Sequence, residues 1–361
     1  MNWDSVERFI TKLINKRYAV PALILGVVVL ILGALTFRQP PGKPLAPPSP
    51  ELIGFYEKGF GTTDPGWPSL QSHYRYFGTV CPFWYSLHAS GDIETIRLEP
   101  HVRDFLMSQK GLKVIPLINN ADGNDKMLTD PEVRKRAIKN ITDLVVNNKY
   151  HGINIDFQGI PAKDKDNYTA FVKELAASLH PKGKMVTLSV FPKVDVSHDV
   201  SGAFDYKALA QYVDWMAMMT YDNHSETSGP GSVAPIDWVE RNIKYALSQG
   251  VPREKLVMTV ASYGYDWPVG KGKAINAGIK DLHERARERG ASIRWDDSSQ
   301  SSFFRYTAND GSKREVWFED GKAAAAKAAL ARKYGLRGVA VWRLGFEDPA
   351  YFHTVVERLR S

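Results

Sequence analysis

The chain is poor in cysteine and in concentrated charge, and each shortage removes a class of protein. Cys81 is the only cysteine among 361 residues, so an intrachain disulfide and a cysteine metal site are excluded. It lies in the apolar run 80–84, which predicts a buried structural thiol. The net charge is +7, yet lysine and arginine form no block of five or more. This favours a solvated basic surface over a nucleic-acid site.

Signals for cofactors and repeats are also missing. The nine histidines are scattered without metal-ligand spacing, and there is no phosphate-binding glycine loop. We therefore predict no metal, nucleotide or other cofactor. Nothing recurs at a fixed period, which argues against a solenoid.

One long apolar run is present near the N-terminus. Residues 18–37 are twenty residues without a charge, enough for a helix to cross a bilayer core of about 30 Å. Four lysines and arginines lie within residues 1–17, which predicts a cytoplasmic N-terminus. The polar residues before the run and the lack of an A-x-A site favour an uncleaved transmembrane anchor over a signal peptide. We expect a single-pass protein of the cell membrane.

Six of the thirteen residues from 38 to 50 are proline, which predicts an extended linker. From residue 51 to 361, short apolar runs alternate with helical patterns, as in βα units with a parallel sheet. An α-helix start is expected at Asp130, with Pro131 in its first position. There are eight apolar runs, the number that closes a (β/α)8 TIM barrel. The runs are Leu52–Tyr56, Gly78–Tyr85, Lys113–Ile118, Gly152–Phe157, Met185–Phe191, Trp215–Thr220, Leu256–Ala261 and Gly338–Trp342.

The spacing between the seventh and eighth runs is too long for one helix. Three strand patterns there, with a turn at Asn309-Asp310-Gly311, predict a small α+β insertion at about residues 268–322. We expect it to lie over one wall of the barrel mouth.

The segment His151–Gln158 carries the strongest functional signal. Ile153, Ile155 and Phe157 alternate with polar residues, which is the period of a strand. The polar residues therefore share one face near the strand's C-terminal end, where a barrel positions its chemistry. They are Asn154, Asp156 and Gln158.

This segment closely resembles the glycoside hydrolase family 18 signature D-G-x-D/N-x-D-x-E, whose final Glu is the proton donor. Gln158 stands at that position. The likeness covers about residues 52–355 and is nearest the bacterial branch with spore-cortex peptidoglycan N-acetylglucosaminidases. Further matches follow in order: Gly159–Pro161, Tyr168–Phe171, Thr187–Val190, Met218–Asp222, Ser262–Trp267 and Val341–Gly345.

The resemblance implies a TIM barrel that acts on glycan containing N-acetylglucosamine, with peptidoglycan ahead of chitin. In such retaining, substrate-assisted enzymes the acetamido oxygen of the substrate attacks the anomeric carbon. Asp156 would hold the acetamido N–H, and Tyr221 would bond its oxygen. Trp342 would form the floor under the sugar. Asn154 would orient Asp156, and Asp222 would be an electrostatic partner.

Gln158 is the departure from the pattern, because a neutral amide cannot serve as a general acid. Three hypotheses follow: glycan binding with lost or reduced hydrolysis, hydrolysis by a displaced acid, or a protein-interaction scaffold at the cell surface. Glu57, after the first strand, is the preferred replacement acid, and Glu347 and Asp348 are further candidates at the mouth.

The aromatic residues and His151 have two interpretations each. Trp84, Tyr85, Tyr263, Trp267 and Trp295 either line a sugar groove or pack in the core. His151, at the first Asp of the signature, is either a partner of the site or a packed residue at a strand start.

Overall fold

Eight parallel strands close into a barrel in the computed structural model, which describes residues 50–58, 65–121, 125–270 and 272–361. The strands pair in chain order, and the last pairs with the first. Each predicted run overlaps a barrel strand, so the predicted TIM barrel is confirmed. The strands are β1 (Glu51–Tyr56), β2 (Thr79–Leu87), β5 (Leu117–Asn120), β6 (Gly152–Asp156), β7 (Met185–Val190), β8 (Trp215–Met218), β9 (Leu256–Ala261) and β15 (Gly338–Trp342).

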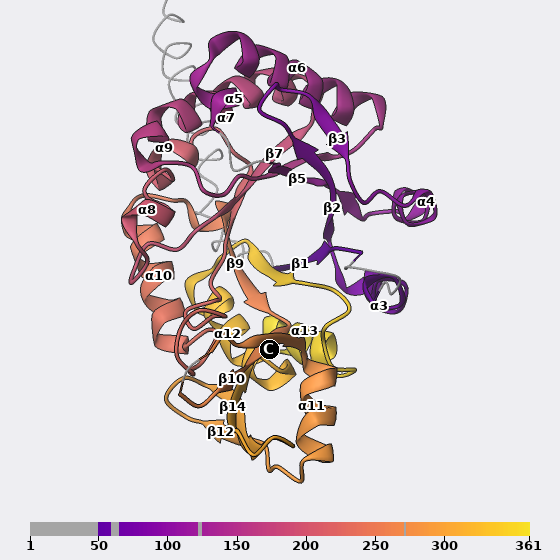
Figure 1. Ribbon diagram of the computed structural model, residues 1–361. Coiled ribbons are helices and arrows are strands. Elements are labelled where there is room, and N and C mark those ends of the chain that lie inside the picture. The colour runs from indigo at the N-terminus through magenta and orange to yellow at the C-terminus, as the bar shows by residue number, and fades with distance from the viewer. Residues whose placement is uncertain (1–49, 59–64, 122–124, 271) are drawn as a thin grey trace, which may run out of the picture. The chain divides into compact units, whose positions relative to one another are not determined.

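Helices follow the strands and surround the barrel (Figure 1). Two short strands, β3 (Ile93–Thr95) and β4 (Lys113–Val114), pair with β2. The helices are α3 (Gly66–His73), α4 (Pro100–Ser108), α5 (Lys126–Thr129), α6 (Pro131–Asn147), α7 (Lys165–Leu179), α8 (His198–Ser201), α9 (Tyr206–Leu209), α10 (Ile236–Ser248), α12 (Gly321–Tyr334) and α13 (Tyr351–Arg360).

The start of α6 follows from its sequence. The Asp130 side chain accepts hydrogen bonds from the backbone N–H groups of Glu132 (3.0 Å) and Val133 (3.3 Å). Pro131, which has no N–H to offer, occupies the first position of the helix. The predicted helix start is therefore confirmed.

Side chains alternate between two apolar cores along the barrel strands. Those that point inward, such as Ile53, Cys81 and Trp215, form one cluster inside the barrel. Those that point outward pack beneath the helices. Cys81 is fully buried, as predicted, and burial raises the pKa of its thiol. Gly152 opens β6 because a β-carbon there would lie 2.3 Å from the Met185 carbonyl oxygen of the next strand.

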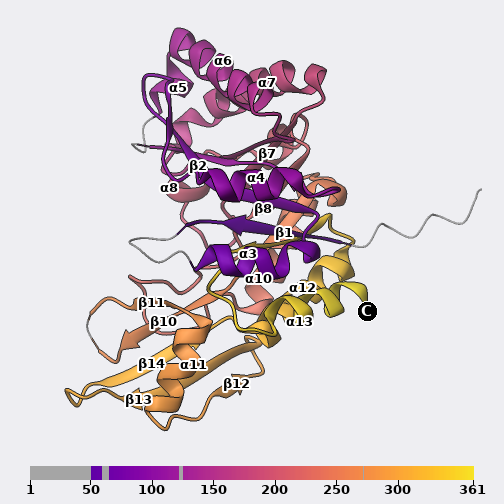
Figure 2. The ribbon, with the colours of Figure 1, turned by 90° about the vertical axis from the view of Figure 1, so that its right-hand side faces the viewer.

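The chain between β9 and β15 forms a separate five-stranded antiparallel sheet with α11 (Ile279–Glu288) over one face (Figure 2). Its strands are β10 (Tyr263–Pro268), β11 (Ile275–Gly278), β12 (Arg294–Asp296), β13 (Ser301–Thr307) and β14 (Lys313–Phe318). The sheet begins ahead of the boundary expected near residue 268, because the aromatic run 263–267 pairs with β11 and β14.

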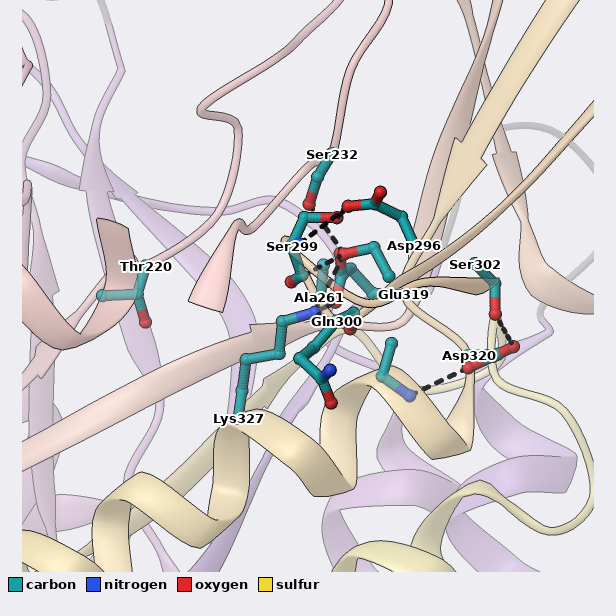
Figure 3. A network of polar contacts seen from close by, with 12 residues as sticks. Thr220, Ser232, Ala261, Asp296, Ser299, Gln300, Ser302, Glu319, Asp320 and Lys327 are labelled. Carbon is teal, nitrogen blue, oxygen red and sulfur yellow. Dashed lines mark hydrogen bonds and ion pairs between the residues drawn. The ribbon is translucent and has the colours of Figure 1, made fainter. Parts of the chain in front are cut away.

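A buried ion pair joins this insertion to the barrel's outer helices (Figure 3). Lys327 of α12 and Glu319 lie 2.7 Å apart, and each side chain is 1% exposed. Lys327 also donates to the Ser301 hydroxyl (2.9 Å), which contacts Ser232 of the β8–α10 segment (2.7 Å). Burial raises the pKa of Glu319 and lowers that of Lys327, while the attraction between the two opposes both shifts.

The predicted N-terminal segments, residues 1–17, 18–37 and most of 38–50, lie outside the described residues. Among the residues that are described, no helix is both long and apolar enough to span a bilayer.

Candidate functional site

A cavity of about 490 Å³ opens where the barrel strands end. Its walls come from β1, β5, β6, β7, β9 and β15 and from the segments that follow β6, β7 and β8, as expected for a TIM barrel. The structure brings together five of the residues expected at the site. Asp156, Gln158, Tyr221, Asp222 and Trp342 all line this cavity.

Asp156 and Gln158 are hydrogen-bonded to each other. Asp156 ends β6 with a side chain that is 9% exposed, whereas Gln158 lies beyond the strand and is exposed. The Gln158 Nε2 atom donates to both Asp156 carboxylate oxygens, at 3.2 and 3.3 Å. Burial raises the pKa of Asp156 to about 6, although the Gln158 donor acts in the opposite direction. The carboxyl group therefore titrates near neutral pH.

Asn120, at the end of β5, holds the backbone of Gln158. Its amide nitrogen donates to the Gln158 carbonyl oxygen (2.7 Å), and its amide oxygen accepts from the Gln158 N–H (2.9 Å). Asn120 is 6% exposed, so both bonds are shielded from water. The sequence offered only an asparagine at a strand end as a signal, and Asn120 was missed.

Asn154 lies below Asp156 on the same strand, but its hydrogen bonds run to the neighbouring strand β7. Its amide donates to Thr187 Oγ1 (3.0 Å) and accepts from Ser189 Oγ (3.0 Å). Asn154 is completely buried. The expectation that Asn154 orients Asp156 is therefore corrected: the Asn154 side chain links β6 to β7 instead.

Tyr221 and Asp222 follow β8, which is separated from β6 by β7 alone, and both line the cavity. Burial, then the nearby Asp156 and Asp222 charges, raise the pKa of Tyr221 well above its ordinary value, so its hydroxyl remains a donor. Asp222 has a left-handed backbone (φ 59°), and its side chain is open to the cavity. Burial by the surrounding protein raises the pKa of Asp222, against the effect of two tyrosine donors.

Those donors are Tyr263 and Tyr265 of the insertion. Their hydroxyls bond Asp222 Oδ1 at 2.7 and 3.0 Å. Tyr263 was expected to contact substrate, but it is 4% exposed and does not line the cavity. Its structural effect is to hold Asp222. Tyr265 was missed because the run 263–267 was not recognised as a strand.

Trp342 ends β15 and is partly buried, with its ring edge-on to Phe55 of β1 at 5.8 Å between centroids. Both rings line the cavity. Together they provide an apolar surface at the bottom of the mouth.

Glu57 is placed differently from the expectation of a displaced acid. Its side chain is 5% exposed and bonds the guanidinium groups of Arg97 and Arg343, the latter at 2.5 Å. Both of its carboxylate oxygens are thus occupied by guanidinium groups. Glu57 also does not line the cavity. Glu347 and Asp348 are similarly occupied, because they accept bonds from the N–H groups of Gly345 and Gly321.

The expected tryptophans of the groove lie in the packed interior. Trp84 has no exposed surface and packs on Tyr150, because it points out of the barrel on β2. Trp267 is 1% exposed, and its indole N–H donates to the Ser225 and Ser228 carbonyls. Both substrate-binding assignments are therefore corrected to packing roles. Trp295 lies under Lys322, with the ammonium 3.7 Å from its ring centroid.

His151 precedes β6, at the end of the strand away from the cavity. Its Nδ1 atom accepts a hydrogen bond from the Val114 N–H (3.0 Å). Burial, then the nearby Lys184, lowers the pKa of His151, so its ring is neutral and serves the packing of the strand start.

The segment after β7 supplies a wall that was not expected. Phe191, Val196 and Val200 give it an apolar surface, and Trp238 of α10 adds a ring. Asp195 at its rim is paired with Arg241 at 2.6 Å. Among the described residues, no cluster of His, Cys, Asp and Glu could hold a metal ion.

Known proteins resemble this chain in sequence and in fold. The sequence model of glycosyl hydrolases family 18 matches residues 83–347. The cortical fragment-lytic enzyme of Bacillus subtilis is 31% identical over 229 residues, which covers 62% of this chain and 53% of that enzyme. This chain thus spans about half the length of that relative.

Solved structures share the fold of this chain. A chitinase from Chromobacterium violaceum has a TM-score of 0.79 and 28% identity, over 86% of this chain and 99% of that one. The spore cortex-lytic enzyme SleL of Bacillus megaterium shares the fold, with a TM-score of 0.77 and 24% identity over 86% and 73%. Because the family match spans more than half of its 361 residues, this chain belongs to glycosyl hydrolase family 18.

Proposed function

We propose that this domain binds glycan with N-acetylglucosamine units in the cavity and hydrolyses it weakly or not at all. The observation that carries the proposal is the pair Gln158–Asp156, in which an amide occupies the position of the family's proton donor. The named relatives act on the spore cortex and on chitin, which supports this glycan class.

The three residues to which we assign glycan binding line the same cavity. Asp156 is an acceptor for the acetamido N–H, Tyr221 is a donor for its oxygen, and Trp342 offers a ring to the sugar face. Substrate assistance supplies the nucleophile, so the protein has to deliver a proton to the leaving oxygen. Gln158 cannot deliver one, and loss of a general acid lowers the rate by about 10²–10⁴-fold.

Hydrolysis by a displaced acid is the alternative, and the contacts of Glu57 weigh against it. A carboxylate held by Arg97 and Arg343 outside the cavity has no access to the bond. The alternative of a protein-interaction scaffold does not account for the open cavity or for the polar groups that converge on it.

The test combines binding and turnover in the full-length protein. Calorimetry with chitohexaose should show binding by wild type and by Gln158→Glu, and a loss of binding in Asp156→Ala. Release of reducing ends should be negligible in wild type and should appear in Gln158→Glu. Rapid release by wild type would refute the proposal, and so would an absence of binding.

We further propose that residues 18–37 anchor the protein in the cell membrane with the barrel outside the cytoplasm. The support is the uncharged run and the basic residues before it. Membrane fractionation with a deletion of residues 1–37 tests this, because the shortened protein should leave the membrane fraction.

A further inference from the structure

The barrel has a second end, opposite the cavity, where basic residues gather. All eight barrel strands are parallel, so the segments that lead from a helix into the next strand meet at this end, which we call the base. Seven such segments hold nine lysines and arginines but only two acidic residues, Asp214 and Glu254. The segments are 74–78, 109–113, 148–151, 180–184, 210–214, 249–255 and 335–337.

The last helix adds Arg358 and Arg360 to the base. It is α13, which follows the last barrel strand and ends beside the end of α12, where a hollow of about 350 Å³ is lined by Arg332, Lys333 and Arg358. Figure 2 shows the C-terminus, at the end of α13, on the side of the barrel where β1 begins. Residues 50–361 as a whole hold only three more basic than acidic residues. The positive charge of the barrel is therefore concentrated at its base.

Few contacts within the protein neutralise this charge. Arg337 pairs with Glu51 at 3.2 Å, and Lys333 pairs with Glu240 at 2.6 Å. Six other cations of the base are exposed and form no ion pair with any residue that the structure describes. They are Lys110, Lys149, Lys182, Arg253, Arg358 and Arg360. An anionic partner would offset the repulsion among these like charges.

The chain also enters the barrel through the base. Glu51 is the first residue of β1, and its N–H donates to the Arg337 carbonyl oxygen at 2.9 Å. Thirteen residues, 38–50, separate it from the uncharged run 18–37 that we propose as the membrane anchor. Because thirteen residues span at most about 45 Å, an anchor in that run would keep the base within this distance of the bilayer.

We infer that the base of the barrel docks on an anionic lipid surface, an inference that rests on the membrane anchor in the proposed function. Each lysine or arginine close to an anionic bilayer strengthens the attraction about five-fold. The bilayer is the polyanion that the anchor brings within reach of the base. Since the cavity opens at the other end of the strands, docking turns the cavity away from the bilayer and toward glycan outside the membrane.

The experiment measures which end of the barrel lies on the bilayer. Full-length protein is reconstituted into vesicles of phosphatidylcholine, with and without phosphatidylglycerol as the anionic lipid. A fluorophore is attached through Ser361→Cys at the base or through Val200→Cys at the mouth, and the buried Cys81 should not compete for it. Lipids with a nitroxide headgroup quench a fluorophore near the surface. We expect quenching at position 361 and little at position 200, in anionic vesicles only, and its loss at high salt.

Charge variants test the residues of the base. Titration of the phosphatidylglycerol content gives the composition at which wild type shows half of its maximal quenching. At that composition Lys149→Gln/Lys182→Gln/Arg358→Gln should lose the quenching, because three five-fold losses lower the ratio of docked to undocked protein about a hundred-fold. The matched control is Lys135→Gln/Lys163→Gln/Lys280→Gln, which removes three exposed lysines outside the base and should be quenched as wild type is.

Flotation of the vesicles separates this inference from the anchor on which it rests. Full-length protein that fails to float with phosphatidylcholine vesicles overturns both the anchor and the docking. Protein that floats but shows equal quenching at the two positions, or unchanged quenching in the base variant, overturns the docking alone. Binding of a soluble glycerol phosphate polymer without quenching on anionic vesicles would assign the base to a wall polymer and overturn the lipid assignment.

Discussion

Gln158 donates its side-chain amide to both carboxylate oxygens of the largely buried Asp156, at 3.2 and 3.3 Å. A carboxyl group in that setting has a pKa of about 6, above the ordinary value of 3.8. The same desolvation that raises the pKa of Asp156 also makes it a strong hydrogen-bond acceptor for a ligand that excludes water. Stability and binding should therefore respond to pH in opposite directions.

For stability, we expect Asp156→Asn to be stabilising at neutral pH. The folded-state pKa is raised, so the contribution of Asp156 to stability is largest below pH 3.8 and falls as pH rises through about 6. A difference of about two pKa units corresponds to about 3 kcal/mol at most. Urea unfolding at pH 4 and pH 8 measures this contribution. The free energies of unfolding of wild type and Asp156→Asn should converge at pH 4 and differ at pH 8. An equal difference at both values would contradict the assignment.

For binding, we expect glycan affinity to rise with pH and to level off above about pH 6. The ionised Asp156 accepts the acetamido N–H, so the bound ligand stabilises the deprotonated form, and protons compete with the ligand below the pKa. Calorimetry with chitohexaose from pH 4.5 to 8 gives the profile. The Asp156→Asn variant should bind weakly with a flat profile, and a flat profile in wild type would point to another acceptor.

Glu57→Gln should lower stability without changing turnover. The substitution weakens two ion pairs in a site that is 5% exposed, and we expect a loss of about 2 kcal/mol, less than for a fully buried pair. Reducing-end release by Gln158→Glu should be equal with and without Glu57→Gln. Loss of that release at unchanged folding would restore Glu57 as a displaced acid.

Asn120→Leu should weaken glycan binding and lower any activity gained in Gln158→Glu. It removes both hydrogen bonds to the Gln158 backbone and leaves a partly buried N–H and C=O without these partners, worth about 1–3 kcal/mol. Calorimetry measures the glycan affinity, and melting curves measure the stability of the variant. Asn148→Leu, at the end of α6, is the matched change and should leave affinity unchanged. Equal effects of both variants on affinity would remove the positioning role of Asn120.

The sequence was sufficient for the barrel and for the groups that converge on its mouth. Strand period and order place Asp156, Tyr221 and Trp342 at one end of parallel strands, and that end is where they meet. Side-chain direction within a strand was harder to predict. Trp84 points outward, where the register between β2 and β5 shifts at Phe83/Tyr85, and a shift of this kind leaves no trace in composition.

Contacts between segments that lie far apart in the sequence could not be predicted either. Glu57 meets Arg343 across 286 residues, and Tyr265 reaches Asp222 across 43. Each pairing depends on how the insertion and the closing strand pack, which no local pattern contains.

Lys327→Met should destabilise the protein strongly, because it leaves Glu319 buried without its cation. Removal of one partner of a buried ion pair costs about 3–5 kcal/mol. The double variant Lys327→Met/Glu319→Leu, which removes both charges, should recover much of this loss, because neither ion then has to be desolvated. Denaturant unfolding of the two single variants and the double variant gives the coupling energy directly. Additive losses would mean that the pair does not act as a unit in joining the insertion to α12, and the network around Ser301 would then be held by its hydroxyl bonds alone.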